Sequence, residues 1–155
     1  MRLKLASALI LATAPAWAAG TINYGSRAGM EVTIVSMSGI NGPNAVIRTK
    51  HTRDNAIAYC RDSVQRVTRK CIETELKTAI SDQISANCPK KEFTNFYGQA
   101  FRFLGLNKNS DSNFPKYKLL DMQTNEIADG SSASGYPINL YLYRHLCPAT
   151  APADE

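Results

Sequence analysis

The spacing of apolar and polar residues changes several times along the chain, and each change predicts a new element. Residues 30–35 alternate between apolar and polar side chains, which is typical of a half-buried strand. Turn-forming residues fill 36–44, and 45–50 then have the composition of a second strand. This part of the sequence predicts an antiparallel pair of strands joined by a long loop.

A helical spacing begins at Thr52, which is a good N-cap residue. Beyond it, apolar residues recur every three or four positions as far as Ile84, and residues 44–87 contain neither proline nor glycine. The sequence allows one long helix over 54–87, or two helices that meet near 63–68. So long a helix is unusual in a small domain, and we therefore favour two.

Strand-like spacing returns in the second half of the chain. Residues 92–105 predict a hairpin that turns at Tyr97 and Gly98 and carries aromatic residues on one face. We expect that aromatic face to belong to the core. Residues 117–120 and 126–128 predict a further short hairpin.

The segment 138–147 fits two kinds of element. Its alternation favours a strand, whereas its three-and-four spacing after Pro137, a residue suited to a first helical turn, favours a helix. We choose the helix. The expected fold class is α+β, with one small domain over 19–147 and a flexible tail at 148–155. Antiparallel hairpins would pack with one long or two short helices and with the C-terminal helix.

The first eighteen residues have the layout of a secretory signal peptide. Arg2 and Lys4 precede an apolar run of ten residues, and the small residues Ala16 and Ala18 occupy the positions that signal peptidase recognises. The run is shorter than the ~20 residues that a spanning helix needs. We expect cleavage after Ala18, no stable membrane anchor, and a periplasmic or secreted protein.

Four cysteines follow the expected cleavage site: Cys60, Cys71, Cys88 and Cys147. In an exported chain they indicate two disulfides, with three possible pairings. On one straight helix, Cys60 and Cys71 would lie about 16 Å apart. A disulfide tolerates only roughly 4.4–6.8 Å between α-carbons. Two helices with Thr68 as the second cap remove this conflict, so we favour the pairs Cys60–Cys71 and Cys88–Cys147.

The charge and the remaining side chains argue against several classes of function. The net charge of +5 falls by two when the basic residues of the signal leave, and the remainder is too small to favour nucleic acid. The cysteines lack the close spacing of a zinc site, and His51 and His145 each stand alone. We expect no metal and no cofactor.

One stretch, ADGSSASGYP at 128–137, invites a chemical interpretation. It lacks the lysine and hydroxyl of a P-loop and the G-x-S-x-G frame of a hydrolase. Its serines could be combined with either histidine, and so unspecific a combination does not identify a nucleophile. We therefore assign no catalytic residue, and a secreted hydrolase that uses serine and histidine stays an alternative.

The same stretch also has a structural and a recognition interpretation. The simpler one is a tight connection into the last element. As a recognition loop it would display Tyr136, stiffened by its neighbours, with small residues beside it. Ser134, Gly135 and Tyr136 are therefore the candidate binding residues. They resemble the Ser-Gly-x-x-Tyr loops of periplasmic lysozyme inhibitors of the C type, although the two spacer residues are missing.

Four stretches, AVIRTKHTRDNAIAYCRD, NFYGQAFRFLG, ADGSSASGYP and HLCP, together resemble a group of small exported bacterial proteins with no assigned function. The resemblance covers most of the chain after the signal. It implies a periplasmic setting and carries over no catalytic or binding residue. The predicted function is a non-catalytic binding or accessory protein of the envelope with an unidentified protein or envelope partner. An inhibitor of an envelope-directed hydrolase such as lysozyme is a second alternative.

Overall fold

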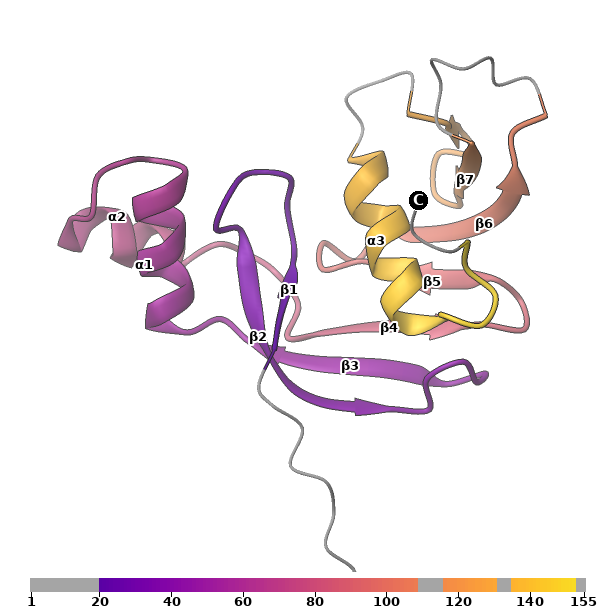
Figure 1. Cartoon of the computed structure of the whole chain (residues 1–155), viewed down its shortest axis with the longest axis horizontal. Coiled ribbons are helices and arrows are strands. Elements are labelled where there is room, and N and C mark those ends of the chain that lie inside the picture. The colour runs from indigo at the N-terminus through magenta and orange to yellow at the C-terminus, as the bar shows by residue number, and fades with distance from the viewer. Residues whose placement is uncertain (1–19, 109–115, 131–134, 153–155) are drawn as a thin grey trace, which may run out of the picture.

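The computed structural model of the chain describes residues 20–108, 116–130 and 135–152. Within these ranges eight strands form a single antiparallel sheet in chain order, and three helices accompany it (Figure 1). The strands are β1 (Thr21–Asn23), β2 (Glu31–Ser38), β3 (Ala45–Lys50), β4 (Gln83–Asn87), β5 (Glu92–Thr94), β6 (Ala100–Leu106), β7 (Tyr117–Asp121) and β8 (Ile127–Ala128). The helices are α1 (Arg53–Asp62), α2 (Arg69–Glu75) and α3 (Tyr136–Leu146). The expected α+β class is confirmed.

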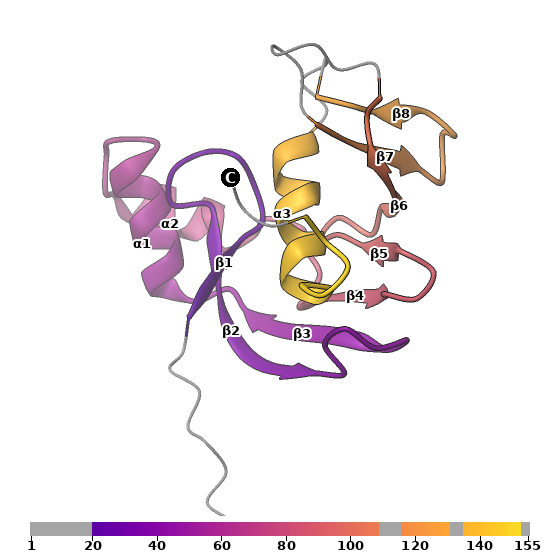
Figure 2. The same ribbon diagram turned by 45° about the vertical axis from the view of Figure 1, so that its right-hand side comes forward.

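The main core lies between the sheet and α3, which crosses one face of it (Figure 2). Phe93 and Phe103 project from β5 and β6 as the alternating pattern predicts, and both are buried. Their rings pack against the ring of Tyr143 in α3, with centroids 5.4 and 4.9 Å apart. Aromatic pairs at this separation contribute beyond the area that they bury. The aromatic face of the second predicted hairpin is therefore core.

The first hairpin is longer than its sequence predicts. Residues 36–38 were expected in the loop, yet β2 continues through them after a register shift between Ile34 and Ser36. Met37 pairs with Ile47 of β3, and the turn begins only at Gly39, where φ is 60°. Pairing with a neighbouring strand outweighs the weak strand preference of the serines.

Two helices occupy the region after Thr52, as the sequence favours. Thr52 and Thr68 are the N-caps of α1 and α2, and each side-chain oxygen accepts a hydrogen bond from the backbone three residues on. The expected continuation of helix to residue 87 is wrong. The chain leaves α2 after Glu75, and β4 lies between β3 and β5 in the sheet, with Ile84 and Ala86 buried on one side.

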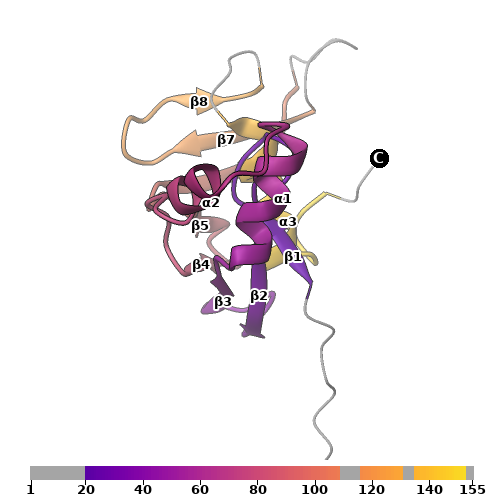
Figure 3. The same ribbon diagram turned by 90° about the vertical axis from the view of Figure 1, so that its left-hand side faces the viewer.

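Both predicted disulfides are present. Cys60–Cys71 joins α1 to α2 with α-carbons 6.1 Å apart. Cys88–Cys147 joins the end of β4 to the end of α3, with α-carbons 5.5 Å apart. The helices α1 and α2 form a separate unit at the other end of the molecule from β7 and β8, with a small core of Ala56, Cys60 and Ile72 (Figure 1). Figure 3 shows the molecule from the side of this helical unit.

The first residues of the C-terminal segment contact the rest of the fold. The backbone N–H of Ala149 donates to Asn41 Oδ1 at 2.7 Å, and Ala151 packs against the main core. Residues 153–155 and the predicted signal at 1–18 lie outside the described residues. Within the part of the chain that is described, no helix is both long and apolar enough to cross a membrane.

Candidate functional site

A cavity of about 370 Å³ opens where three parts of the fold meet. One wall is the β1–β2 turn, the second is the β5–β6 turn, and the third is the first half of α3. We call it the Tyr97 cavity, and its lining includes Tyr24, Arg27, Met30, Asn95, Tyr97, Gln99, Gly135, Ile138, Asn139 and Leu142. Tyr97 is half exposed at the cavity, unlike the other aromatic residues of the β5–β6 hairpin.

Asn95 organises the polar wall of the Tyr97 cavity. Its Oδ1 accepts hydrogen bonds from the backbone N–H groups of Tyr97 and Gln99, at 2.9 and 3.1 Å, and this fixes the turn. Its Nδ2 donates to Gln99 Oε1 and to Asn139 Oδ1, each at 3.0 Å. Because every hydrogen-bonding position of Asn95 is used, the β5–β6 turn and α3 are held in a fixed relation.

Asn139 is the residue of α3 that this network reaches. The residue is only 4% exposed, and its Oδ1 accepts the hydrogen bond from Asn95. Its Nδ2 lies on the side of Gly135, another lining residue. The amide of Asn139 therefore forms part of the cavity wall at the start of α3.

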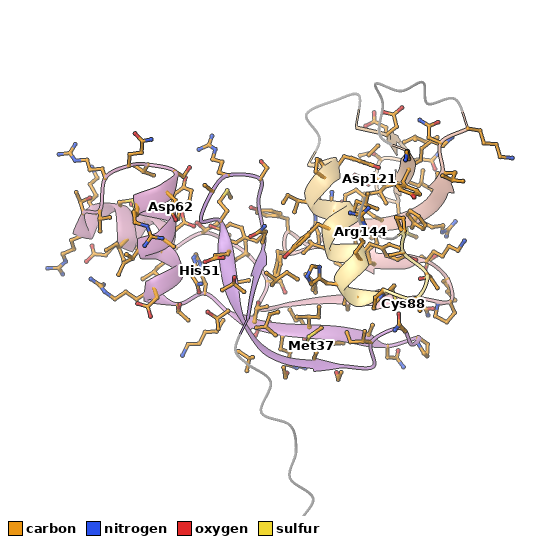
Figure 4. The ribbon with its side chains drawn as sticks, in the orientation of Figure 1. Met37, His51, Asp62, Cys88, Asp121 and Arg144 are labelled. Carbon is orange, nitrogen blue, oxygen red and sulfur yellow. A yellow bond between two sulfur atoms is a disulfide. The ribbon has the colours of Figure 1, made fainter. Side chains whose placement is uncertain are left out.

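A second polar cluster adjoins Tyr24, one of the residues that line the Tyr97 cavity. The hydroxyl of Tyr24 donates to Glu75 Oε1, and His51 Nε2 lies 3.7 Å from the same oxygen. The rings of Tyr24 and His51 are 5.6 Å apart, and Figure 4 shows His51 beside the β1–β2 hairpin. Glu75 belongs to α2, so this cluster ties the helical unit to the sheet and to the cavity wall.

Burial dominates the electrostatics of this cluster. It raises the pKa of the Tyr24 phenol, and the hydrogen bond to Glu75 raises that pKa further. It lowers the pKa of His51, although the Glu75 carboxylate opposes this shift. Both ring nitrogens of His51 are buried without a hydrogen-bond partner among the described residues. His51 is therefore held as a neutral ring against a carboxylate at neutral pH.

The predicted binding residues do not form a displayed loop. Ser134 lies outside the described residues. Tyr136 is only 3% exposed, and its hydroxyl donates to the backbone oxygen of Tyr117 at 2.7 Å, so the expectation of a displayed tyrosine is corrected. The helical period places Tyr136 on the same face as Leu140 and Tyr143, which face the core.

Gly135 keeps a place at the site. It is the N-cap residue of α3, has a positive φ of 71°, and lines the Tyr97 cavity. Asn95 and Asn139 were missed by sequence reasoning. The signal available for Asn139 was an amide among the apolar positions of a helix, which calls for a buried partner. Nothing local pointed to Asn95 as that partner.

The alternative chemistries gain no support from the described residues. His145 Nδ1 lies 3.0 Å from the backbone oxygen of Tyr141, and neither histidine hydrogen-bonds to a serine or threonine hydroxyl in the described chain. Ser131 and Ser132 lie outside the described residues. Over the described ranges, His, Cys, Asp and Glu side chains form no group that could hold a metal ion.

No family model, curated protein or solved structure matches this chain. The interpretation of the Tyr97 cavity therefore rests on the residues that line it.

Proposed function

We propose that the protein is an exported, disulfide-stabilised binding protein of the bacterial envelope, and that the Tyr97 cavity is its binding site. The volume of about 370 Å³ is in the range of small-molecule sites, which are concave and mostly apolar with a few fixed polar groups. The observation that carries the proposal is the half-exposed Tyr97 in a cavity whose polar wall is fixed by the Asn95–Asn139 hydrogen bond.

Export is supported by two independent features. The first eighteen residues have the layout of a signal peptide. The four cysteines form two disulfides, which persist in oxidising compartments such as the periplasm. The resemblance to small exported bacterial proteins agrees with this setting. A periplasmic or secreted location is accordingly part of the proposal.

The cavity favours binding over the two alternatives. The comparison with lysozyme inhibitors depended on a displayed Tyr136, and that side chain is buried. A hydrolase needs a nucleophile beside its base; no described serine hydroxyl bonds to His51 or His145, and the candidate serines at 131, 132 and 134 lie outside the described residues. Tyr97, by contrast, offers an exposed aromatic surface beside fixed amides, which suits a small polar ligand.

The proposal is tested by ligand retention. The mature protein is incubated with the low-molecular-mass fraction of an envelope extract, washed, and examined by native mass spectrometry. We expect a bound species on the wild type that is lost in Tyr97→Ala. Ile127→Ala is the control, because Ile127 is 56% exposed on β8 and does not line the cavity. Retention that is equal in all three proteins, or absent from all, contradicts the proposal.

A further inference from the structure

We propose that the Cys60–Cys71 disulfide is a site of reversible thiol–disulfide exchange, at which an incoming thiolate attacks the sulfur of Cys71 and releases Cys60. The inference goes beyond the proposed function and needs no ligand in the Tyr97 cavity. It rests on the unequal exposure of the four cysteines, on a hollow beside Cys71, and on the small core of the helical unit.

Cys71 differs from the other three cysteines in its exposure. Cys60, Cys88 and Cys147 are at most 1% exposed, whereas Cys71 is only partly buried and packs against the core of the helical unit. Because a thiolate has to reach the sulfur that it attacks, a buried disulfide exchanges only after the fold opens around it. Of the two disulfides, only Cys60–Cys71 has a cysteine that solvent reaches.

A hollow of about 350 Å³ gives access to Cys71. The residues that line it come from α1, from the loop after α1 and from α2, and they include Tyr59, Val64, Thr68, Lys70, Cys71 and Thr74. Cys60 does not line the hollow and is 0% exposed, so it offers no approach to a thiolate. The hollow therefore selects Cys71 as the sulfur that is attacked, with Cys60 as the sulfur that leaves.

The exchange balances with thiols as the only co-reactant. A thiolate bonds to Cys71 Sγ, the bond between Cys60 and Cys71 breaks, and Cys60 Sγ takes the electron pair and then a proton from water. A second thiolate attacks the mixed disulfide at the sulfur of the first, and Cys71 leaves as a thiolate. Two thiols are oxidised to one disulfide while the protein's disulfide is reduced, and an excess of the oxidised small disulfide reverses the reaction.

The charges at the hollow do not repel a thiolate. Lys70 lines the hollow and belongs to none of the ion pairs among the described residues. Glu75 also lines it, and its carboxylate accepts the hydrogen bond from Tyr24. Arg69 and Glu73 form an ion pair with each other on α2. These opposite charges balance, so an anionic sulfur meets no net negative charge.

Reduction of this bond disturbs only a small part of the core. The helical unit has its own buried core of Ala56, Cys60 and Ile72, whereas Cys88 and Cys147 belong to the main core between the sheet and α3. Exchange at Cys60–Cys71 needs movement of α1 and α2 alone, and exchange at Cys88–Cys147 needs loss of packing in the main core. The oxidation state of the first bond therefore determines whether the helical unit is held closed.

The test measures which sulfur reacts and how fast. The oxidised mature protein is incubated under native conditions with reduced glutathione or with a reduced dithiol oxidoreductase, quenched with acid, alkylated and examined by peptide mass spectrometry. We expect Cys60–Cys71 to be reduced at least about tenfold faster than Cys88–Cys147, because only the buried pair waits for the main core to open. We expect the mixed disulfide on Cys71, with Cys60 as the alkylated thiol, and recovery of the bond with oxidised glutathione.

Two bulky substitutions test the hollow as the route of access. Thr74 lies three residues after Cys71 on α2, so the two side chains are neighbours on the helix surface. Thr74→Trp should cover Cys71 and remove most of the difference in rate between the two disulfides. Lys77→Trp is the matched control, because Lys77 is exposed and does not line the hollow, and it should leave both rates unchanged.

Several outcomes overturn the inference. These are equal rates for the two disulfides, faster reduction of Cys88–Cys147, a mixed disulfide on Cys60, no reaction with either reductant, or equal rates in Thr74→Trp and Lys77→Trp. Reaction with glutathione alone supports the inference with a small thiol as the co-reactant, and reaction with the oxidoreductase alone supports it with a protein thiol. Retention of a ligand in the Tyr97 cavity affects none of these results, so this inference and the proposed function fail separately.

Discussion

Gly29 is the residue at which the β1–β2 turn touches α1. Its φ is +73°, and a Cβ built on it would lie 2.7 Å from backbone atoms of Ala58 and Tyr59. Both the backbone conformation and the space require glycine. We expect Gly29→Ala to lower the free energy of unfolding by about 2–4 kcal/mol, combining left-handed strain with overpacking against backbone. Urea unfolding of the mature protein measures this loss.

Gly98 provides the matched control for Gly29. Its φ is +75°, yet a Cβ there would have no atom within 4 Å. Gly98→Ala therefore carries the left-handed strain alone, about 1–2 kcal/mol. Equal losses in the two variants would show that the close approach of the turn to α1 contributes nothing.

His51 makes stability depend on pH. Because burial lowers the pKa of His51 below its ordinary value of 6.5, the unfolded chain binds the proton more tightly than the folded one. The stabilisation is present above pH 6.5 and is lost as the pH falls through and below that value. We expect the urea midpoint to fall in this range, and the fall to be smaller in His51→Gln.

His145 supplies the control for the pH measurement. His145→Gln keeps the Tyr24–Glu75–His51 cluster and should retain the dependence on pH. If His51→Gln and the wild type lose stability in parallel as the pH falls below 6.5, the assignment to His51 is wrong.

Single residues were predictable where their role is local. Thr52 and Thr68 cap helices through bonds to residues three positions away, so the sequence alone identifies both. Tyr136 was misplaced because a glycine-flanked tyrosine has the composition of a loop, whereas the helix that follows turns it into the core. Asn95 and Asn139 are separated by 44 residues, so only the fold brings them together.

At the scale of elements, the two disulfides hold different parts of the fold. Cys60–Cys71 spans 11 residues and should contribute about 3 kcal/mol, and Cys88–Cys147 spans 59 residues and should contribute about 4 kcal/mol by loop closure. Cys88 and Cys147 are also buried in the main core. We therefore expect the double variant Cys88→Ala with Cys147→Ala to lose more stability than Cys60→Ala with Cys71→Ala, measured by urea unfolding.

Hydrogen exchange distinguishes the two losses further. The helical unit has a buried core of only Ala56, Cys60 and Ile72, so removing Cys60–Cys71 should speed exchange chiefly in α1 and α2. Removing Cys88–Cys147 should speed it across β4 and α3. Uniform changes in both variants would contradict this division into two units.

Elements were predictable when their own residues determine them. The β5–β6 and β7–β8 hairpins carry clear local patterns, and the structure has them where expected. The pattern of 138–147 fitted both a strand and a helix, and the structure has the helix that we chose. The helix expected through residue 87 failed because Ile80 and Ile84 are four apart, a spacing that suits a helix, while pairing with β3 and β5 makes β4 a strand. β1 has three residues and is defined by its pairing with β2.

At the scale of the whole molecule, the cavity connects the two units. Tyr24 lines the Tyr97 cavity on one side and donates to Glu75 of α2 on the other. Gly29 brings the same turn against α1. The position of the helical unit and the shape of the cavity therefore depend on one turn, between β1 and β2. The sequence indicated two helices joined by a disulfide within one domain, but not this connection, because it joins residues about fifty positions apart.

The eight strands lie side by side in the sheet in the same order as in the chain, which is also the order of their synthesis. Each hairpin can form from residues already synthesised, whereas α3, which contacts β1, β3 and β4, comes after the last strand. Contacts between distant residues form slowly, so docking of α3 belongs at the end of folding. The Cys88–Cys147 bond needs that docking. An oxidised Cys88–Cys147 pair thus marks a chain in which α3 has docked on the sheet.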